Sequence, residues 1–314
     1  MTTTAPARTD SLTLSPAPIP PVGNTPLVRL RRVVDAASPA VEVWAKCEWA
    51  NPSGSVKDRA AAAILRQAIE EGSLADGRVL LDSTSGNMGI AYATFAAALG
   101  VPVHLALPAN ASPERIAVLR ALGAQLTLTD PTEGSDGARL VAAQMAADEP
   151  RRFFYADQYS HPANWRAHFD TTGPEVLAQT EGRLTHFVAG LGTTGTLTGT
   201  GRFLRRSATA VRLVGVQPAT PLHGLEGLKH LETSPVPPIF DPTVVDETIA
   251  VETEDAYAMA RRLARDEGLL VGVSAAAAAV AALRLTSRLD SAVIVVLFPD
   301  SGLKYLTQDF WSRS

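Results

Sequence analysis

The chain has 314 residues, and at about 150 residues per domain this length predicts two domains. Lys and Arg total 28 against 32 Asp and Glu, a near balance that excludes the strongly basic profile of nucleic-acid-binding proteins. Hydrophobic residues make up 46% of the chain, enough for a large core, while the single cysteine, Cys47, excludes an internal disulfide and a cysteine-based zinc cluster. No apolar run reaches the roughly 20 residues of a membrane span without a charge, Gly or Pro. We therefore expect a soluble, cytoplasmic globular protein with no membrane or nucleic-acid partner.

The first 21 residues differ in composition from the rest of the chain. They are rich in Thr, Ser, Pro and Ala, and they lack the basic head and apolar stretch of a secretory signal. We expect a disordered tail over 1–21 that takes no part in the chemistry.

Beyond the tail, short apolar runs alternate with segments of helical period. The expected strands are Val41–Glu48, Val79–Asp82, Val101–Leu107, Gln125–Thr129, Phe153–Tyr155, Thr185–Gly190, Val211–Pro218 and Ala292–Asp300. The expected helices are Asp58–Glu71, Ile90–Leu99, Pro113–Leu122, one that ends at Arg206, and Thr253–Gly268. Strands and helices that alternate at this spacing predict an α/β fold with mostly parallel, twisted sheets flanked by helices.

Four strand-to-helix junctions are rich in Gly, Ser or Thr. They span 51–58, 83–89, 190–201 and 299–304. In open α/β sheets ligands bind beyond the carboxyl ends of the strands, and such turns present backbone N–H groups there. The junctions therefore predict one polar site for a small molecule.

The string GLGTTG, Gly190 to Gly195, allows three interpretations. A dinucleotide fingerprint would need an acidic residue at the end of the next strand, where this chain has Gln217 and Pro218. A cradle for a phosphate monoester would use the N–H groups and hydroxyls of Gly192, Thr193, Thr194, Gly195 and Thr196 at a helix N-terminus. A turn that merely packs would not need repeated Thr hydroxyls.

Only four lysines occur, and one of them lies where a strand gives way to a helix. This is Lys57, in NPSGSVKDR, where the positive end of the helix disfavours the ammonium and helps to keep an amine or imine reactive. Lys46 and Cys47 lie on an alternating strand. We expect Lys46 to be a structural or rim residue and Cys47 to belong to the core.

Five motifs, together with VGNTPLVRL at 22–30, resemble the cysteine synthase family in their order and spacing. They are NPSGSVKDR, STSGNMGIA, DQYSHPAN, GLGTTGT and FPDSG, and the resemblance covers residues 22–307. This family consists of pyridoxal-phosphate enzymes with the tryptophan synthase β fold. The resemblance implies a smaller, substrate-closing domain (51–159), a larger domain that binds the cofactor phosphate (22–50 and 160–314), and pyridoxal 5′-phosphate in the cleft between them. It also implies a homodimer.

The resemblance assigns cofactor roles to residues of all four junctions. Lys57 would hold the cofactor covalently and, once displaced, act as the base that transfers the proton. Asn87 would bond to the ring hydroxyl oxygen, and the loop 192–196 would bind the phosphate. Ser301 would face the pyridine nitrogen. A hydroxyl there leaves the ring a weak electron sink, which suits elimination of a good leaving group.

The resemblance also assigns residues to the substrate. Thr84 and Ser85 match the loop for the substrate carboxylate, and Gln158 matches its partner; taken alone, this loop also fits a helix cap. Met88 stands where the family usually has Thr, which replaces a hydroxyl by an apolar chain. Lys229 stands near the place where O-phosphoserine-using members carry Arg. Our hypothesis is that Lys229 recruits an anionic leaving group; the alternative is a solvated loop charge.

The expected function is therefore that of a cysteine synthase. The O-acetyl or O-phospho group of an O-activated L-serine would be replaced by sulfide, or by a sulfide donor, to give L-cysteine. The alternatives are condensation of serine with homocysteine, as in cystathionine β-synthase, serine or threonine deamination, and a catalytically silent homologue that binds an amino acid or a partner. The intact Lys57 argues against the silent homologue. We expect no metal, because the six histidines include no H-x-x-x-H pair.

Overall fold

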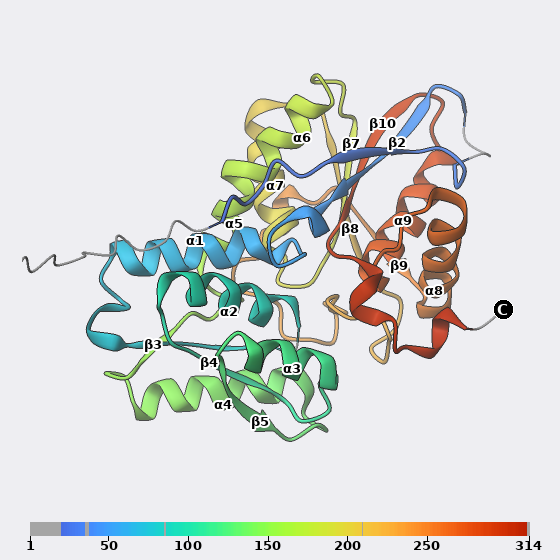
Figure 1. Cartoon of the computed structure of the whole chain (residues 1–314). Helices are drawn as coiled ribbons and strands as arrows, with labels where there is room; N and C mark the ends of the chain where they lie inside the picture. The colour runs from blue at the N-terminus through green and yellow to red at the C-terminus, as the bar shows by residue number, and fades with distance from the viewer. Residues whose placement is uncertain (1–19, 35–37, 85, 209, 313–314) are drawn as a thin grey trace, which may run out of the picture.

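The computed structural model describes residues 20–34, 38–84, 86–208 and 210–312, arranged around two sheets (Figure 1). The larger sheet has the strand order β1 (Leu27–Leu30), β2 (Val41–Cys47), β10 (Ala292–Phe298), β7 (His186–Gly190), β8 (Arg212–Pro218) and β9 (Glu247–Val251). The smaller sheet has the order β5 (Gln125–Thr129), β4 (Val103–Pro108), β3 (Val79–Ser83) and β6 (Phe153–Tyr155). All neighbouring strands are parallel except β1 and β2. The expected α/β fold is confirmed.

Alternate residues of the strands pack against helices on opposite faces of each sheet. The helices are α1 (Lys57–Glu70), α2 (Asn87–Leu99), α3 (Pro113–Ala121), α4 (Gly134–Asp148), α5 (Pro162–Ala167), α6 (Gly173–Gln179), α7 (Gly195–Ser207), α8 (Thr253–Arg262) and α9 (Val273–Thr286). In the smaller sheet, Leu80 packs with α1 and α2, and its neighbour Leu81 packs with α4. In the larger sheet, Val188 packs with α8 and α9, and Phe187 packs with α6 and α7.

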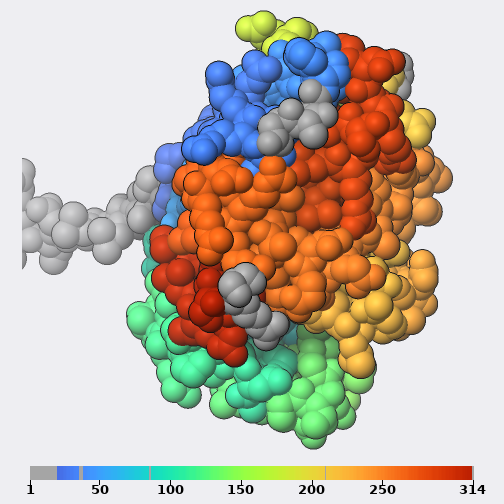
Figure 2. Space-filling model, turned by 90° about the vertical axis from the view of Figure 1, so that its right-hand side faces the viewer, coloured from blue at the N-terminus to red at the C-terminus, as the bar shows by residue number. Residues whose placement is uncertain are grey.

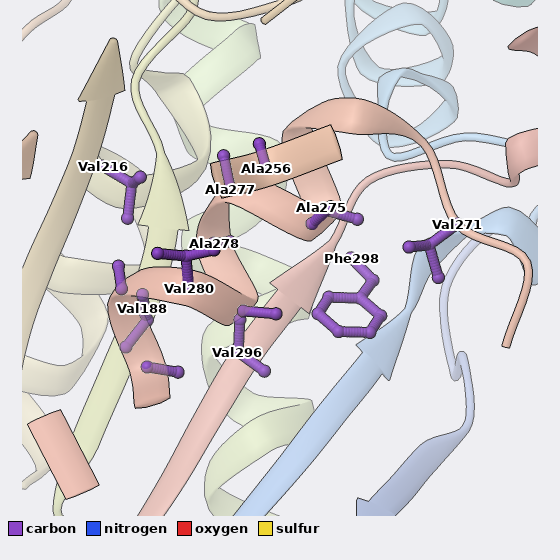
Figure 3. Close-up of a cluster of buried hydrophobic side chains, with 14 of the residues drawn as sticks. Val188, Val216, Ala256, Val271, Ala275, Ala277, Ala278, Val280, Val296 and Phe298 are labelled. Carbon is purple, nitrogen blue, oxygen red and sulfur yellow. The ribbon is translucent and has the colours of Figure 1, made fainter. Parts of the chain in front are cut away.

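The helix α9 is the centre of the largest core. Its alanines and Val280 pack against Val188, Val216 and Val296 of the sheet, with Phe298 beside them (Figure 3). Small side chains let a helix lie close to a sheet, so 12 of its 14 residues are buried. Figure 2 shows the red C-terminal segment lying across both parts of the molecule, from the orange α8–α9 layer to the green smaller part.

The expected strands and helices occur near their predicted bounds, with differences that have local causes. The strand predicted from Val101 begins at Val103, because the Val101 N–H bonds to Ala96 O at the end of α2. The helix predicted to end at Gly268 changes to a π-helical turn at Leu263–Glu267. The sequence analysis did not predict β1, β9, α4, α5, α6 or α9.

Each of the two expected domains contains one sheet. Every strand of the smaller sheet lies within 79–155, and the strands of the larger sheet lie within 27–47 and 186–298. Ala163 of α5 packs with the smaller sheet's core, so this core extends past the boundary predicted at 159. The domain limits stay predictions, and residues 1–19 of the predicted tail lie outside the described residues.

Candidate active site

A cavity opens between the two sheets, where the strand-to-helix junctions meet. Eight of the predicted site residues line it: Lys57, Thr84, Asn87, Met88, Gln158, Gly192, Thr193 and Lys229. Thr194 is the N-cap of α7, Gly195 and Thr196 belong to its first turn, and neither these three residues nor Ser301 are part of the lining. Ser85 falls outside the described residues. The structure therefore brings residues of three predicted junctions to one cavity.

Lys57 is the first residue of α1, and the end of β10 fixes the turn before it. The Val56 N–H donates to Pro299 O at 2.8 Å, and Ser55 pairs with Asp300 in an isolated β-bridge. Burial lowers the pKa of the Lys57 amine, and the charge of Lys304 lowers it further, while Asp300 opposes both. A larger fraction of Lys57 is therefore neutral, and nucleophilic toward an aldehyde, than in a free lysine.

The loop before α7 has the shape of an anion cradle. A Cβ at Gly192 would clash with Gly227 O, and a Cβ at Gly195 would clash with Asn164 Oδ1, so only glycine allows these approaches. Thr194 at the N-cap has a φ of 69°, and its buried hydroxyl has no partner among the described residues. A phosphate would satisfy this hydroxyl and the free N–H groups that begin a 13-residue helix. The loop therefore fits a phosphate monoester.

A buried histidine that the sequence analysis missed supports this cradle. His168 Nε2 lies 3.3 Å from Thr196 Oγ1, and its Nδ1 lies 2.9 Å from Thr172 Oγ1. Burial lowers the pKa of His168 far below its usual range, and the charges of Arg59 and Lys57 add to this shift. A neutral His168 orients Thr196 without adding charge. Its spacing of four residues from Thr172 on one helical face was the only signal for it in the sequence.

The predicted carboxylate loop is built as a helix cap. The hydroxyl of Thr84 accepts from the N–H groups of Gly86 at 3.3 Å and of Gly89 at 3.1 Å, so its own O–H is left to donate. Gln158 Nε2 donates to Ser83 O at 2.9 Å, which joins the second predicted carboxylate residue to the same loop. The cap interpretation and the substrate interpretation of Thr84 are therefore compatible.

Met88 and Asp82 lie behind this loop. Met88 is buried in the core of the smaller sheet while it borders the cavity. Asp82, which the sequence analysis missed, accepts from the N–H of Ser83 at 2.7 Å and of Gln158 at 3.3 Å. Burial raises the pKa of Asp82 to about 7. Its carboxyl group links the two segments that border the carboxylate site.

Ser301 uses its hydroxyl within its own segment. The hydroxyl donates to Leu270 O at 3.3 Å and accepts from the N–H of Leu303 at 3.2 Å. Ser274, in the first turn of α9, is 5% exposed, and its hydroxyl makes no hydrogen bond within the described part of the chain. Gly272, two residues before it, lies against Asp300, where a Cβ would clash with Oδ1. Ser274 is thus a second candidate for the pyridine nitrogen, beside the predicted Ser301.

Two ion pairs cross the mouth of the cavity. Arg115 of α3 pairs with Glu226, and Lys229 Nζ lies 3.0 Å from Asp136 Oδ1 of α4. The ammonium of Lys229 also lies 5.3 Å from the ring centroid of Tyr159. Each pair joins the loop 226–229 to a helix that packs on the smaller sheet.

Comparison with known proteins decides the family. A family model described as "Pyridoxal-phosphate dependent enzyme" matches residues 19–300. The chain belongs to this family. Its cofactor is pyridoxal phosphate, as the resemblance to the cysteine synthases implies and the cradle before α7 permits.

Relatives and solved structures agree with this assignment. A cysteine synthase of Aquifex aeolicus is 52% identical over 93% of this chain and 90% of that protein. Cysteine synthase B of Escherichia coli is 43% identical over 91% of this chain and 93% of that protein. A crystal structure of cysteine synthase from Entamoeba histolytica superposes with a TM-score of 0.90 at 30% identity, covering 100% of this chain and 95% of that one. The predicted family and the tryptophan synthase β-like fold are confirmed.

The parts of the chain that the structure describes hold neither a membrane-spanning helix nor a cluster of metal ligands. No helix there is long and apolar enough to cross a bilayer. Nor do three or more His, Cys, Asp or Glu side chains gather there in a way that could hold a metal ion.

Proposed function

We propose that this enzyme is a cysteine synthase that replaces the O-acetyl or O-phospho group of an O-activated L-serine by sulfide, or by a sulfide donor, to give L-cysteine. The observation that carries the proposal is the place of Lys57. Its amine, with a lowered pKa, lies in one cavity with the phosphate cradle and the Thr84 loop. The named relatives, at 52% and 43% identity, support the same reaction.

Each residue of the cavity has a separate task in this proposal. The hydroxyl of Thr84 and the loop beside Gln158 hold the substrate carboxylate. The bound pyridoxal phosphate withdraws electron density from the α-carbon. The Lys57 amine takes the α-proton as acetate or phosphate leaves the β-carbon with the electron pair of the Cβ–O bond. Sulfide then bonds to the β-carbon, and Lys57 returns a proton to the α-carbon.

The charges at the mouth favour the neutral acetyl ester over the phosphate ester. Arg115 and Lys229 supply two positive charges, and their partners Glu226 and Asp136 supply two negative ones. A phosphate dianion must separate one of these pairs, whereas an acetyl group need not. We propose O-acetylserine as the preferred substrate. O-phosphoserine is the second candidate, because Lys229 lies at the mouth of the cavity. Lys229 can pair with the phosphate group once its ion pair with Asp136 is broken.

The test is the ratio of kcat/KM for the two esters with sulfide, measured by the formation of cysteine. Wild type is expected to prefer O-acetylserine. Asp136→Asn frees Lys229 and is expected to raise kcat/KM for O-phosphoserine about tenfold, whereas Lys229→Ala lowers it and leaves O-acetylserine almost unchanged. A wild type that prefers O-phosphoserine would overturn the choice of ester. Failure with both esters, and turnover of serine instead, would overturn the reaction.

We also propose a homodimeric assembly and a cytoplasmic location, which the family resemblance supports. Light scattering of the purified protein tests the first, and fractionation of the source cells tests the second.

A further inference from the structure

The side-chain amide of Asn87 lies between two charged groups from the segment that follows β10. Its Oδ1 accepts from Lys304 Nζ at 2.7 Å, and its Nδ2 donates to Asp300 Oδ2 at 2.7 Å. An ammonium can only donate a hydrogen bond, and an ionised carboxylate can only accept one. The chemistry of the two neighbours therefore fixes which end of the amide faces each of them.

Both neighbours are themselves held in place. Asp300 is completely buried, and its Oδ2 also accepts from the hydroxyl of Tyr305 at 2.8 Å. Lys304 Nζ also donates to Ser53 O at 3.2 Å, in the turn that leads to Lys57. Asp300 pairs with Ser55 of the same turn. The segment 300–304 thus connects the turn before Lys57 with the first residue of α2.

We propose that Asp300 and Lys304 are positioning residues, which hold Asn87 so that its one remaining N–H donates to the ring hydroxyl oxygen of the cofactor. The proposal rests on the role assigned to Asn87 by the family resemblance. An amide rotated by half a turn would present its carbonyl oxygen to that oxygen, and two acceptors repel each other. Asp300 and Lys304, which together we call the clamp, exclude this orientation. It would also place the amide nitrogen against an ammonium and the carbonyl against a carboxylate.

The two charges of the clamp cancel within the site. Lys304 lowers the pKa of the Lys57 amine, and Asp300 raises it. Loss of either one alone therefore changes the charge beside Lys57 as well as the orientation of Asn87. A test of positioning must separate these two effects.

A double-mutant cycle on cofactor affinity makes this separation. The holoenzymes of wild type, Lys304→Met, Asn87→Ala and the double variant are dialysed against a series of pyridoxal phosphate concentrations, and the bound cofactor is read from its visible absorption. We expect Lys304→Met to weaken binding about tenfold in wild type and less than twofold in Asn87→Ala, since one charge-assisted hydrogen bond is then already lost. Asp300→Asn is expected to behave in the same way.

Two matched variants serve as controls. Lys304→Arg keeps a cationic donor and is expected to retain the affinity of wild type within about threefold. Leu303→Ala alters an exposed side chain of the same turn and is expected to change nothing. Circular dichroism checks that each variant is folded, and if Lys304→Met is not, the Asp300→Asn cycle decides.

The proposal is overturned if Lys304→Met and Asp300→Asn weaken binding equally with and without Asn87, because their effect would then not pass through Asn87. It is also overturned if they have no effect. Neither result depends on an ester substrate, so failure of this proposal and failure of the proposed reaction are distinguishable.

Discussion

Asp82 is an acid that burial keeps protonated to an unusually high pH. Its pKa rises from 3.8 to about 7, chiefly through burial, and Asp157 raises it further, while the N–H groups of Ser83 and Gln158 lower it. The folded protein thus binds the proton more tightly than the unfolded chain does. The free energy of unfolding therefore falls as the pH rises from about 4 to about 7, and it levels off above that.

We predict that Asp82→Asn removes this loss. The free energy of unfolding of the variant, relative to wild type, is expected to rise by up to about 3 kcal/mol between pH 5 and pH 8. Urea denaturation at unit steps of pH measures it. Asp148→Asn, an exposed carboxylate, provides the control. A difference between variant and wild type that does not change with pH would contradict the prediction.

The two serine candidates for the pyridine nitrogen differ in how free their hydroxyls are. Ser301 already caps its own turn, and Ser274 has no partner within the described segments. We predict that Ser274→Ala shifts the absorption maximum of the bound cofactor and lowers kcat about tenfold, because a hydrogen bond to the ring is lost. Ser301→Ala is expected to leave the spectrum unchanged. The reverse result would favour the role that the sequence predicts for Ser301.

At the scale of elements, a buried ion network joins β2, α1 and α6. Lys46 Nζ lies 2.6 Å from Glu175 Oε2, and the guanidinium of Arg59 pairs with Glu175 and with Glu48. Burial would raise the pKa of Glu175, but the hydrogen bonds and charge of Arg59, and then those of Lys46, outweigh it and lower the pKa to about 2. This contribution to stability is present above the usual pKa of 4.5 and is lost as the pH falls toward 2.

Removal of the Glu175 carboxylate should leave the buried cations of Lys46 and Arg59 without a negatively charged partner that they share. We predict that Glu175→Gln lowers the free energy of unfolding at pH 7 by about 3 kcal/mol, as is typical for breaking a buried pair. Chemical denaturation measures this loss. Asp255→Asn breaks the surface pair with Arg284 and is expected to cost less than about 1 kcal/mol. An equal decrease in the free energy of unfolding of both variants would contradict the prediction that the buried network contributes more to stability than the surface pair.

The sequence predicted those elements whose pattern is local. Strands such as Gln125–Thr129 and the glycine-rich loop before α7 follow from residues near one another in the chain. The helix α9 was missed because its alanines surround it on all faces and leave no amphipathic period. Lys46 was expected to be a structural or rim residue, and it is completely buried. Its charge is compensated by Glu175, which lies 129 residues away in the sequence and so gave no local signal.

The candidate site also contains residues that local motifs predict and residues that only the tertiary structure reveals. Lys57, Asn87 and Gly192 lie at junctions whose composition marks them, and the structure brings them to one cavity. The sequence did not predict that Asp300 and Lys304 hold Asn87 in place, because their contacts with Asn87 span 213 and 217 residues. Motifs locate groups that meet a ligand, whereas groups that orient them depend on the tertiary fold.

At the scale of the whole molecule, the two ion pairs at the mouth are charge-complementary links between the parts. The loop 226–229 carries an anion and a cation, and the helices α3 and α4 carry their partners in the opposite order. A shift of either part along the other would bring like charges together, so the pairs favour one closed register. Glu226→Gln combined with Asp136→Asn removes both attractions and retains the shapes of the side chains.

We predict that this double variant populates an open form. Its radius of gyration from small-angle scattering is expected to exceed that of wild type without substrate and to return to the wild-type value with O-acetylserine, since a substrate held by the Thr84 loop and by the cofactor in the phosphate cradle links the two parts. KM for O-acetylserine is expected to rise about tenfold, whereas kcat changes little, because substrate must first compensate for the lost closure. Asp255→Asn, which breaks a pair far from the mouth, should change neither quantity. A loss in kcat at unchanged KM would instead place these pairs in the chemical step.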